Sequence, residues 1–148
     1  MSDLDPENAN TYHSNGKKTI LQLSDLNIQL ETKMSLVSSK SYIVFHDAYQ
    51  YFEKRYKLNP IASVTASSGH STSVGRLIDI RKKIKIKNVL CIFTEPQFSP
   101  KLVETVISGT TVKTGILDPI GTSIPPGPEM YFTLLNNISH SISTCFKK

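Results

Sequence analysis

The chain has 148 residues, enough for one domain with a single hydrophobic core and too few for two full domains. A hydrophobic content of 39% and a charged content of 20% are ordinary for a globular protein and exclude a disordered or fibrous chain. The net charge of +5 raises the question of nucleic-acid binding, because Lys and Arg contacts to phosphate drive such binding.

The N-terminal segment predicts a long helix. Asp5-Pro6-Glu7 is typical of a helix start, because Asp5 can cap free backbone N–H groups and Pro6 suits the first helical position. Apolar or small residues then recur mostly at spacings of three, four and seven, as on one face of a helix: Ala9, Tyr12, Gly16, Ile20, Leu23, Leu30, Met34 and Val37. The weak helix formers around Gly16 are expected to fray or bend it.

Four short apolar segments downstream alternate with helical patterns. The predicted strands are Tyr42–Phe45, Ile61–Val64, Val89–Phe93 and Val112–Leu117. The predicted helices cover Asp47–Lys57, Val74–Ile84, a short stretch from Pro100 to Val106, and Tyr131–Cys145. This alternation predicts an α/β fold with a four-stranded, mostly parallel sheet flanked by helices.

A polar side chain follows three of the predicted strands. His46 comes after the first, Glu95 after the third and Asp118 after the fourth. Ligands bind beyond the carboxyl ends of parallel strands, and one imidazole with two carboxylates suits a divalent metal such as zinc. Two plainer interpretations stay open, since His46 can hydrogen-bond a neighbouring backbone and Asp118-Pro119 can simply shape a turn.

The remaining histidines and the basic residues are expected to be exposed to solvent. His13, His70 and His140 lie in a helix, a Ser-rich loop and the last helix. Five basic residues fall within seven positions, at the end of the helix that precedes the third strand: Arg81, Lys82, Lys83, Lys85 and Lys87. We expect no nucleic-acid partner, although a basic nucleic-acid-binding module remains an alternative that salt-sensitive binding to random DNA would reveal.

Two cysteines, Cys91 and Cys145, are compatible with one disulfide or with two buried thiols, and their spacing does not decide between them. The sequence lacks the Gly-x-Ser-x-Gly, Walker, His-Glu-x-x-His and Cys-x-x-Cys signatures. No run approaches the ~20 apolar residues that cross a bilayer, so no membrane span is predicted.

Several stretches resemble bacterial zinc-uptake substrate-binding proteins of the ZnuA type. The segment Tyr42–Lys54, which reads YIVFHDAYQYFEK, resembles the family's third ligand segment. Cys91–Phe98 and Leu117–Thr122 resemble two further family stretches in the same order, and Asp3–Ala9 is similar to the start of the helix between the family's lobes. The segment from Thr65 to Val74 departs from the family, because it lacks the proline-bearing pattern expected there.

The resemblance implies a set of functional residues. In that family two α/β lobes hold zinc between them with three histidines and a variable fourth ligand, and His46 is the histidine that matches the C-terminal lobe. Asp118 matches the carboxylate that completes the site in manganese-binding relatives, and its role here is either ligand or support for a ligand. Glu95 is expected to orient a ligand through a hydrogen bond. Cys91 and Cys145 match the family's disulfide.

The resemblance also implies the organisation and partners. Residues 1–40 are expected to form the helix that connects two lobes, and residues 41–148 the C-terminal lobe. We expect a non-enzymatic zinc carrier of the periplasm that delivers Zn²⁺ to an ABC importer, a permease with its ATPase. The N-terminal lobe and a signal peptide are missing from the sequence, so we expect a truncated or split part of the carrier. A remnant without transport activity is the alternative.

Overall fold

The computed structural model describes residues 1–65 and 73–147 of the chain. After a short 3₁₀ turn, η1 (Pro6–Asn8), five α-helices and four strands follow within these residues: α1 (Ala9–Ser35), β1 (Ser41–Val44), α2 (Gln50–Arg55), β2 (Asn59–Ser63), α3 (Val74–Ile86), β3 (Cys91–Thr94), α4 (Lys101–Ile107), β4 (Lys113–Ile116) and α5 (Met130–Cys145). Their order confirms the predicted alternation of strands and helices.

The four strands form one parallel sheet in the order β2-β1-β3-β4. Central strand β1 pairs with β2 on one side and with β3 on the other, where Tyr42 lies opposite Cys91. Helices cover both faces of the central strands, so β1 and β3 are mostly buried, whereas the edge strands β2 and β4 are more exposed. The α/β fold class predicted from the sequence is therefore confirmed.

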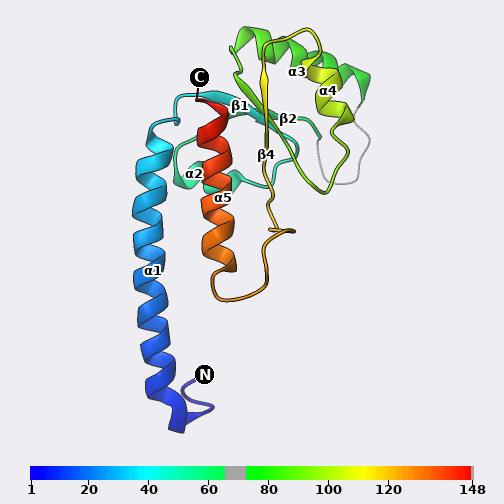
Figure 1. Ribbon diagram of the computed structural model, residues 1–148. Coiled ribbons are helices and arrows are strands. Elements are labelled where there is room, and N and C mark those ends of the chain that lie inside the picture. The colour runs from blue at the N-terminus through cyan, green and yellow to red at the C-terminus, as the bar shows by residue number, and fades with distance from the viewer. Residues whose placement is uncertain (66–72, 148) are drawn as a thin grey trace.

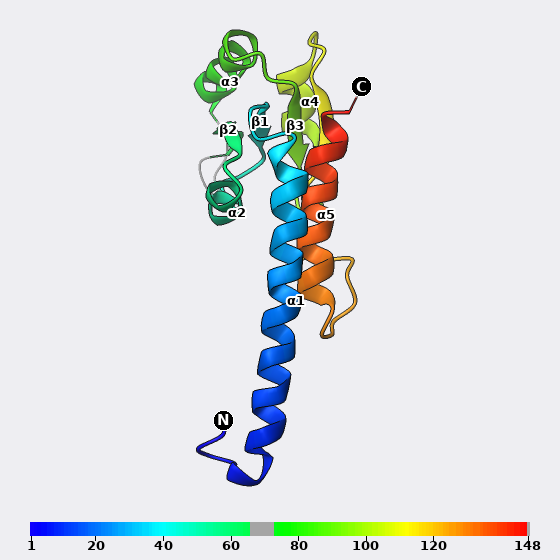
Figure 2. The same ribbon diagram turned by 90° about the vertical axis from the view of Figure 1, so that its left-hand side faces the viewer.

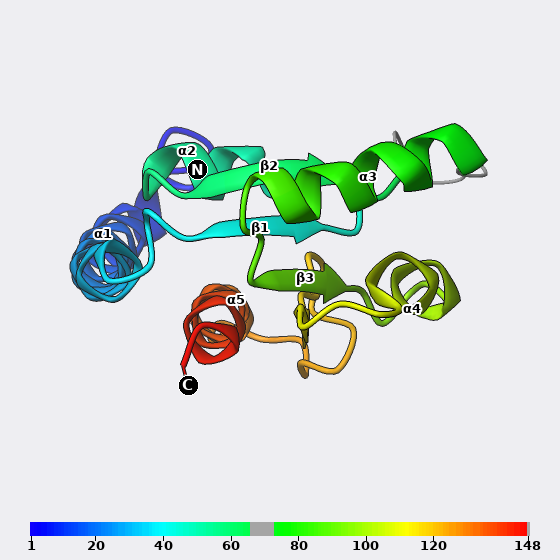
Figure 3. The same ribbon diagram turned by 90° about the horizontal axis from the view of Figure 1, so that it is seen from above.

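The core is divided between the two faces of the sheet. Tyr42 and Val44 of β1 pack on one face with residues of α1, α2 and α5, where the rings of Tyr42 and Phe93 meet edge to face at 5.7 Å. Ile43, in between, points to the other face and packs with residues of α3 and α4. Figure 1 shows α3 above β1 and β2, with α2 and most of α5 below them, and Figure 3, seen from above, shows β2, β1 and β3 side by side.

Helix α1 packs against α5 only through its C-terminal part. Leu26, Leu30 and Met34 are buried, and the two helices run side by side (Figures 1 and 2). The N-terminal half of α1 extends beyond the rest of the molecule, and Ile20 and Leu21 are each 67% exposed. The predicted long helix is present, but the apolar face indicated by the spacing is buried only in its C-terminal half.

Two local predictions need correction. The Asp5 side chain does not cap the helix; its carboxylate accepts hydrogen bonds from the Asn8 amide and the Tyr12 hydroxyl. The predicted helix Asp47–Lys57 shortens to α2, and Tyr51 within it is 84% exposed. Residues 47–49 precede the helix, and Phe52 and Tyr56, rather than Tyr51, pack against the core.

A disulfide joins Cys91 of β3 to Cys145 of α5, with their Cα atoms 6.2 Å apart. It ties the centre of the sheet to the last helix and confirms the pairing that the family resemblance implied. The exposed basic residues Lys82, Lys83 and Lys85 lie on the C-terminal half of α3, as predicted.

Among the described residues, none of the helices combines the length and apolar content needed to cross a bilayer. His13 and His140 are exposed, as expected. The expectation for His70 falls outside the described residues, and so does most of the segment from Thr65 to Val74.

Candidate metal site at the carboxyl edge of the sheet

The strand order places a crevice between β1 and β3. The chain leaves β1 to form β2 on one side, and the next strand, β3, lies on the opposite side of β1. Connections that diverge in this way open a crevice at the carboxyl ends of the two strands, which is where α/β sheets bind ligands. His46 follows β1 and Glu95 follows β3, so both side chains arise at this point.

His46 and Glu95 form a close pair there. The His46 Nδ1 atom lies 2.7 Å from Glu95 Oε1, and the two side chains are 20% and 1% exposed. When Glu95 is ionised its oxygens only accept hydrogen bonds, so the contact then requires the proton on Nδ1. The other nitrogen, Nε2, then keeps its lone pair and can bind a metal.

Aromatic rings surround the pair. The Phe98 ring meets the His46 ring edge to face, with 6.0 Å between ring centroids, and stacks on Phe45 with 4.8 Å between centroids.

Burial raises the pKa of Glu95, and the neighbouring His46 opposes that shift. The carboxylate is therefore held in an apolar wall, where its charge depends on the imidazole beside it.

Asp118 has a different environment, because both of its oxygens are used by its own turn. Oδ1 accepts hydrogen bonds from Gln97 Nε2 at 2.8 Å and from the Gly121 amide at 3.0 Å, and Oδ2 accepts from the amide and hydroxyl of Thr122. Although burial raises its pKa, the hydrogen bonds from Thr122 and Gln97 lower it below the ordinary value. Gly121 has a φ of +69°, a conformation that favours glycine.

The three predicted residues do not assemble into one cluster. Within residues 1–65 and 73–147, no three His, Cys, Asp or Glu side chains gather in a way that could hold a metal ion. The structure thus joins His46 to Glu95 and leaves Asp118 occupied with its turn. Sequence reasoning missed Gln97, which bonds Asp118, and Tyr49, which is only 4% exposed beside the pair.

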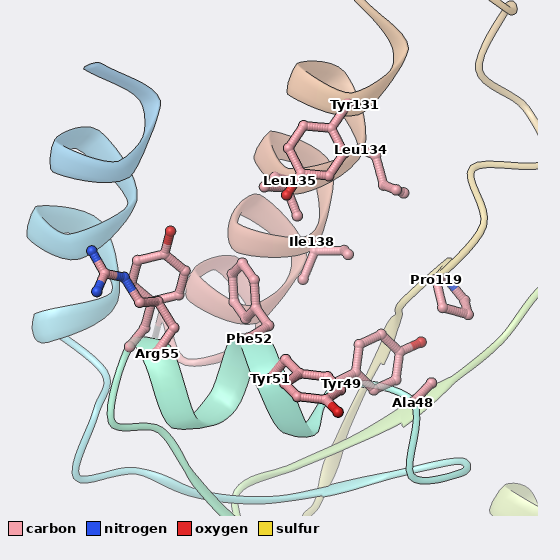
Figure 4. A pocket seen from close by; sticks show the side chains of 11 residues that line it. Ala48, Tyr49, Tyr51, Phe52, Arg55, Pro119, Tyr131, Leu134, Leu135 and Ile138 are labelled. Carbon is pink, nitrogen blue, oxygen red and sulfur yellow. The ribbon is translucent and has the colours of Figure 1, made fainter. Parts of the chain in front are cut away.

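An apolar groove adjoins the site. It has a volume of about 350 Å³ and lies between α2, the N-terminal half of α5 and Pro119 (Figure 4). Phe52 and Arg55 of α2 face Leu135 and Ile138 of α5 across it, and the Tyr49 ring lies at the end near Pro119. The groove is therefore continuous with the residues that follow His46.

A family model described as "ZnuA: Zinc-uptake complex component A periplasmic" matches residues 1–145. The chain belongs to this family. The ZnuA protein of Brucella suis, described as a high-affinity zinc uptake system protein, is 40% identical over 148 residues. That match covers 100% of the chain described here and 44% of the Brucella protein, so the chain spans less than half of that relative's length.

Solved structures of the ZnuA type and its relatives have the same fold. A crystal structure of ZnuA superposes with a TM-score of 0.82 at 25% identity, covering 99% of this chain and 52% of that one. A Zn(II)-bound variant of AdcAII from Streptococcus pneumoniae gives a TM-score of 0.78 at 27% identity, covering 99% of this chain and 53% of that one. In both, the likeness extends over about half of the longer chain.

Proposed function

We propose that this chain supplies the C-terminal half of a zinc site in a ZnuA-type carrier, with His46 Nε2 as the ligand. The observation that carries the proposal is the Nδ1 contact to the buried Glu95 carboxylate at the carboxyl edge of the sheet. Histidines that bind metals commonly donate their other N–H to a carboxylate in this way. In the same proposal, residues 1–40 form the connecting helix and residues 41–148 the lobe.

One imidazole provides only part of a zinc site. Zinc in proteins usually has four ligands, and the described part of the chain gathers no third His, Cys, Asp or Glu near the pair. Tight capture therefore needs ligands from a second half, which the length of the Brucella relative allows. The bare N-terminal half of α1 and the apolar groove beside Tyr49 are the surfaces that such a half would cover.

The hydrogen bonds of Asp118 favour a supporting role over a ligand role. If the Asp118 oxygens bound a metal instead, the backbone amides of Gly121 and Thr122 would lose their hydrogen-bond acceptors. We therefore assign Asp118 to holding the loop after β4, and His46 to the metal. The zinc is cargo, which the carrier delivers in the periplasm to a permease with its ATPase, and the disulfide suits that oxidising compartment.

The test is calorimetric titration of the chain with Zn²⁺, alone and mixed with the N-terminal portion of the Brucella suis relative. His46→Ala should abolish any binding by the chain alone and weaken binding by the mixture by at least about tenfold. His140→Ala is the matched control, since His140 lies on the exposed face of α5 and its ring has a hydrogen bond with Thr144, one turn further along the same helix. Equal losses in both variants would indicate nonspecific surface binding and refute the proposal.

A further inference from the structure

Two buried oxygen atoms beside His46 lack hydrogen-bond partners. Within the described part of the chain, the Tyr49 hydroxyl and Glu95 Oε2 are buried and neither makes a hydrogen bond. The residues are 4% and 3% exposed, so water cannot easily satisfy either atom. Leaving such a group unpaired costs about 1–3 kcal/mol, which makes two unpaired groups in one place unusual.

The two atoms are chemically matched. A tyrosine hydroxyl donates and a carboxylate oxygen accepts, and Glu95 already uses its other oxygen for His46. The residues also interact directly: burial raises the pKa of the Tyr49 hydroxyl, and the nearby Glu95 carboxylate raises it further. A hydrogen bond between the two would satisfy both buried atoms at once.

We propose that Tyr49 is a positioning residue that donates its hydroxyl to Glu95 Oε2 and thereby fixes the orientation of the His46 ring. The hydroxyl holds one carboxylate oxygen, the other oxygen holds Nδ1–H, and Nε2 is left directed outward. The inference deepens the proposed zinc function and rests on it. Tyr49 itself contacts no metal.

The position of Tyr49 suits this role. It lies three residues after His46, just before α2 begins, and the centroids of the two rings are 6.4 Å apart. In Figure 4 the Tyr49 ring lies between α2 and the segment that carries Pro119. Its neighbour Tyr51 points to solvent with 84% of its surface exposed, so only one of the two tyrosines can serve the pair.

Nuclear magnetic resonance of the His46 ring nitrogens in the chain without metal tests the proposal directly. In the unmodified chain the Nδ1–H tautomer should dominate near neutral pH, and Tyr49→Phe should produce a mixture of both tautomers. Tyr42→Phe is the matched control, because the buried Tyr42 hydroxyl also donates to a carboxylate, that of Glu53 in α2, and not to Glu95. An unchanged tautomer in Tyr49→Phe, or equal changes in both variants, would overturn the proposal.

Zinc titration separates this inference from the proposed function. Tyr49→Phe should weaken Zn²⁺ binding by about 10-fold or more, the usual effect of losing a residue that supports a ligand. In one outcome, zinc leaves the His46 resonances of the unmodified chain unchanged while the His46 tautomer still depends on Tyr49. That result would refute the proposed zinc function and support the hydrogen bond from Tyr49 to Glu95.

A measurement on the unmodified chain covers the case in which Tyr49→Phe does not fold. The Tyr49 hydroxyl proton should exchange slowly and show a nuclear Overhauser contact to the Glu95 methylene protons. Rapid exchange, like that of the Tyr51 hydroxyl, would contradict the hydrogen bond.

Discussion

At the scale of single residues, Glu53 is a carboxylate buried for a structural purpose. It lies on α2, is 6% exposed, and accepts a hydrogen bond from the Tyr42 hydroxyl at 2.9 Å. Burial raises its pKa, and the bond from Tyr42 lowers it in part. The folded chain therefore binds a proton at Glu53 more tightly than the unfolded chain does.

This difference predicts a pH dependence of stability. Because the folded chain holds the extra proton, the free energy of unfolding should fall as pH rises from the unfolded pKa of Glu53 through its raised folded pKa. Glu53→Gln keeps an oxygen for Tyr42 and removes the charge, so it should flatten this decline and raise the melting temperature at neutral pH. Melting curves of both proteins, recorded from below the unfolded pKa of Glu53 to neutral pH, check this prediction. A lower melting temperature for Glu53→Gln than for the unmodified chain at neutral pH would contradict it.

At the scale of elements, the disulfide links β3 to α5 across 54 positions of sequence. Closing a loop of that length stabilises a chain by about 4 kcal/mol in the chain-entropy model. The double variant Cys91→Ala with Cys145→Ala should therefore lose several kcal/mol of unfolding free energy in denaturant titrations. A reductant should produce a similar loss in the unmodified chain and none in the variant; a loss below 1 kcal/mol would refute the estimate.

The elements themselves were largely predictable from the sequence. The apolar runs indicated all four strands, most clearly the central strands β1 and β3, whose residues are buried on both faces of the parallel sheet. Strand-end reasoning also found His46 and Glu95, since a polar residue after a buried run stands out. Their direct contact depends on the strand order, which places β3 next to β1 and which the pattern alone does not specify.

Features that depend on three-dimensional packing were not predictable. Tyr49 is buried because the turn after β1 folds back toward β3, whereas Tyr51 has the same chemical character and is exposed. The need for glycine at position 115 also depends on packing, because a Cβ atom there would lie 2.6 Å from the Phe93 ring on the neighbouring strand. Ile20 fitted the helical stripe, but nothing within the described residues covers it.

At the scale of the whole molecule, the uncovered half of α1 is the surface on which the proposed second half is expected to bind. The double variant Ile20→Ser with Leu21→Ser should leave the melting temperature of the chain nearly unchanged, because both side chains are already exposed. It should weaken binding to the N-terminal portion of the Brucella suis relative by at least about tenfold, since burying each such side chain is worth roughly 1.5–3 kcal/mol.

Lys17→Ser with Lys18→Ser is the matched control for that experiment, because it changes two exposed residues of the same helix segment without removing apolar surface. Calorimetry of each mixture measures the association. If the two double variants weaken binding equally, the apolar side chains do not form the contact.

The one-sided attachment of α1 also makes it a lever. Its buried residues begin at Leu26, so about 17 residues run free from there to Ala9, a length of roughly 25 Å at 1.5 Å per residue. A bend of 10° at the pivot would displace the far end by about 4 Å, several times the tolerance of a metal–ligand bond. In the proposed carrier, where a second half supplies further zinc ligands, the stiffness of α1 near this pivot would therefore affect how accurately those ligands reach His46.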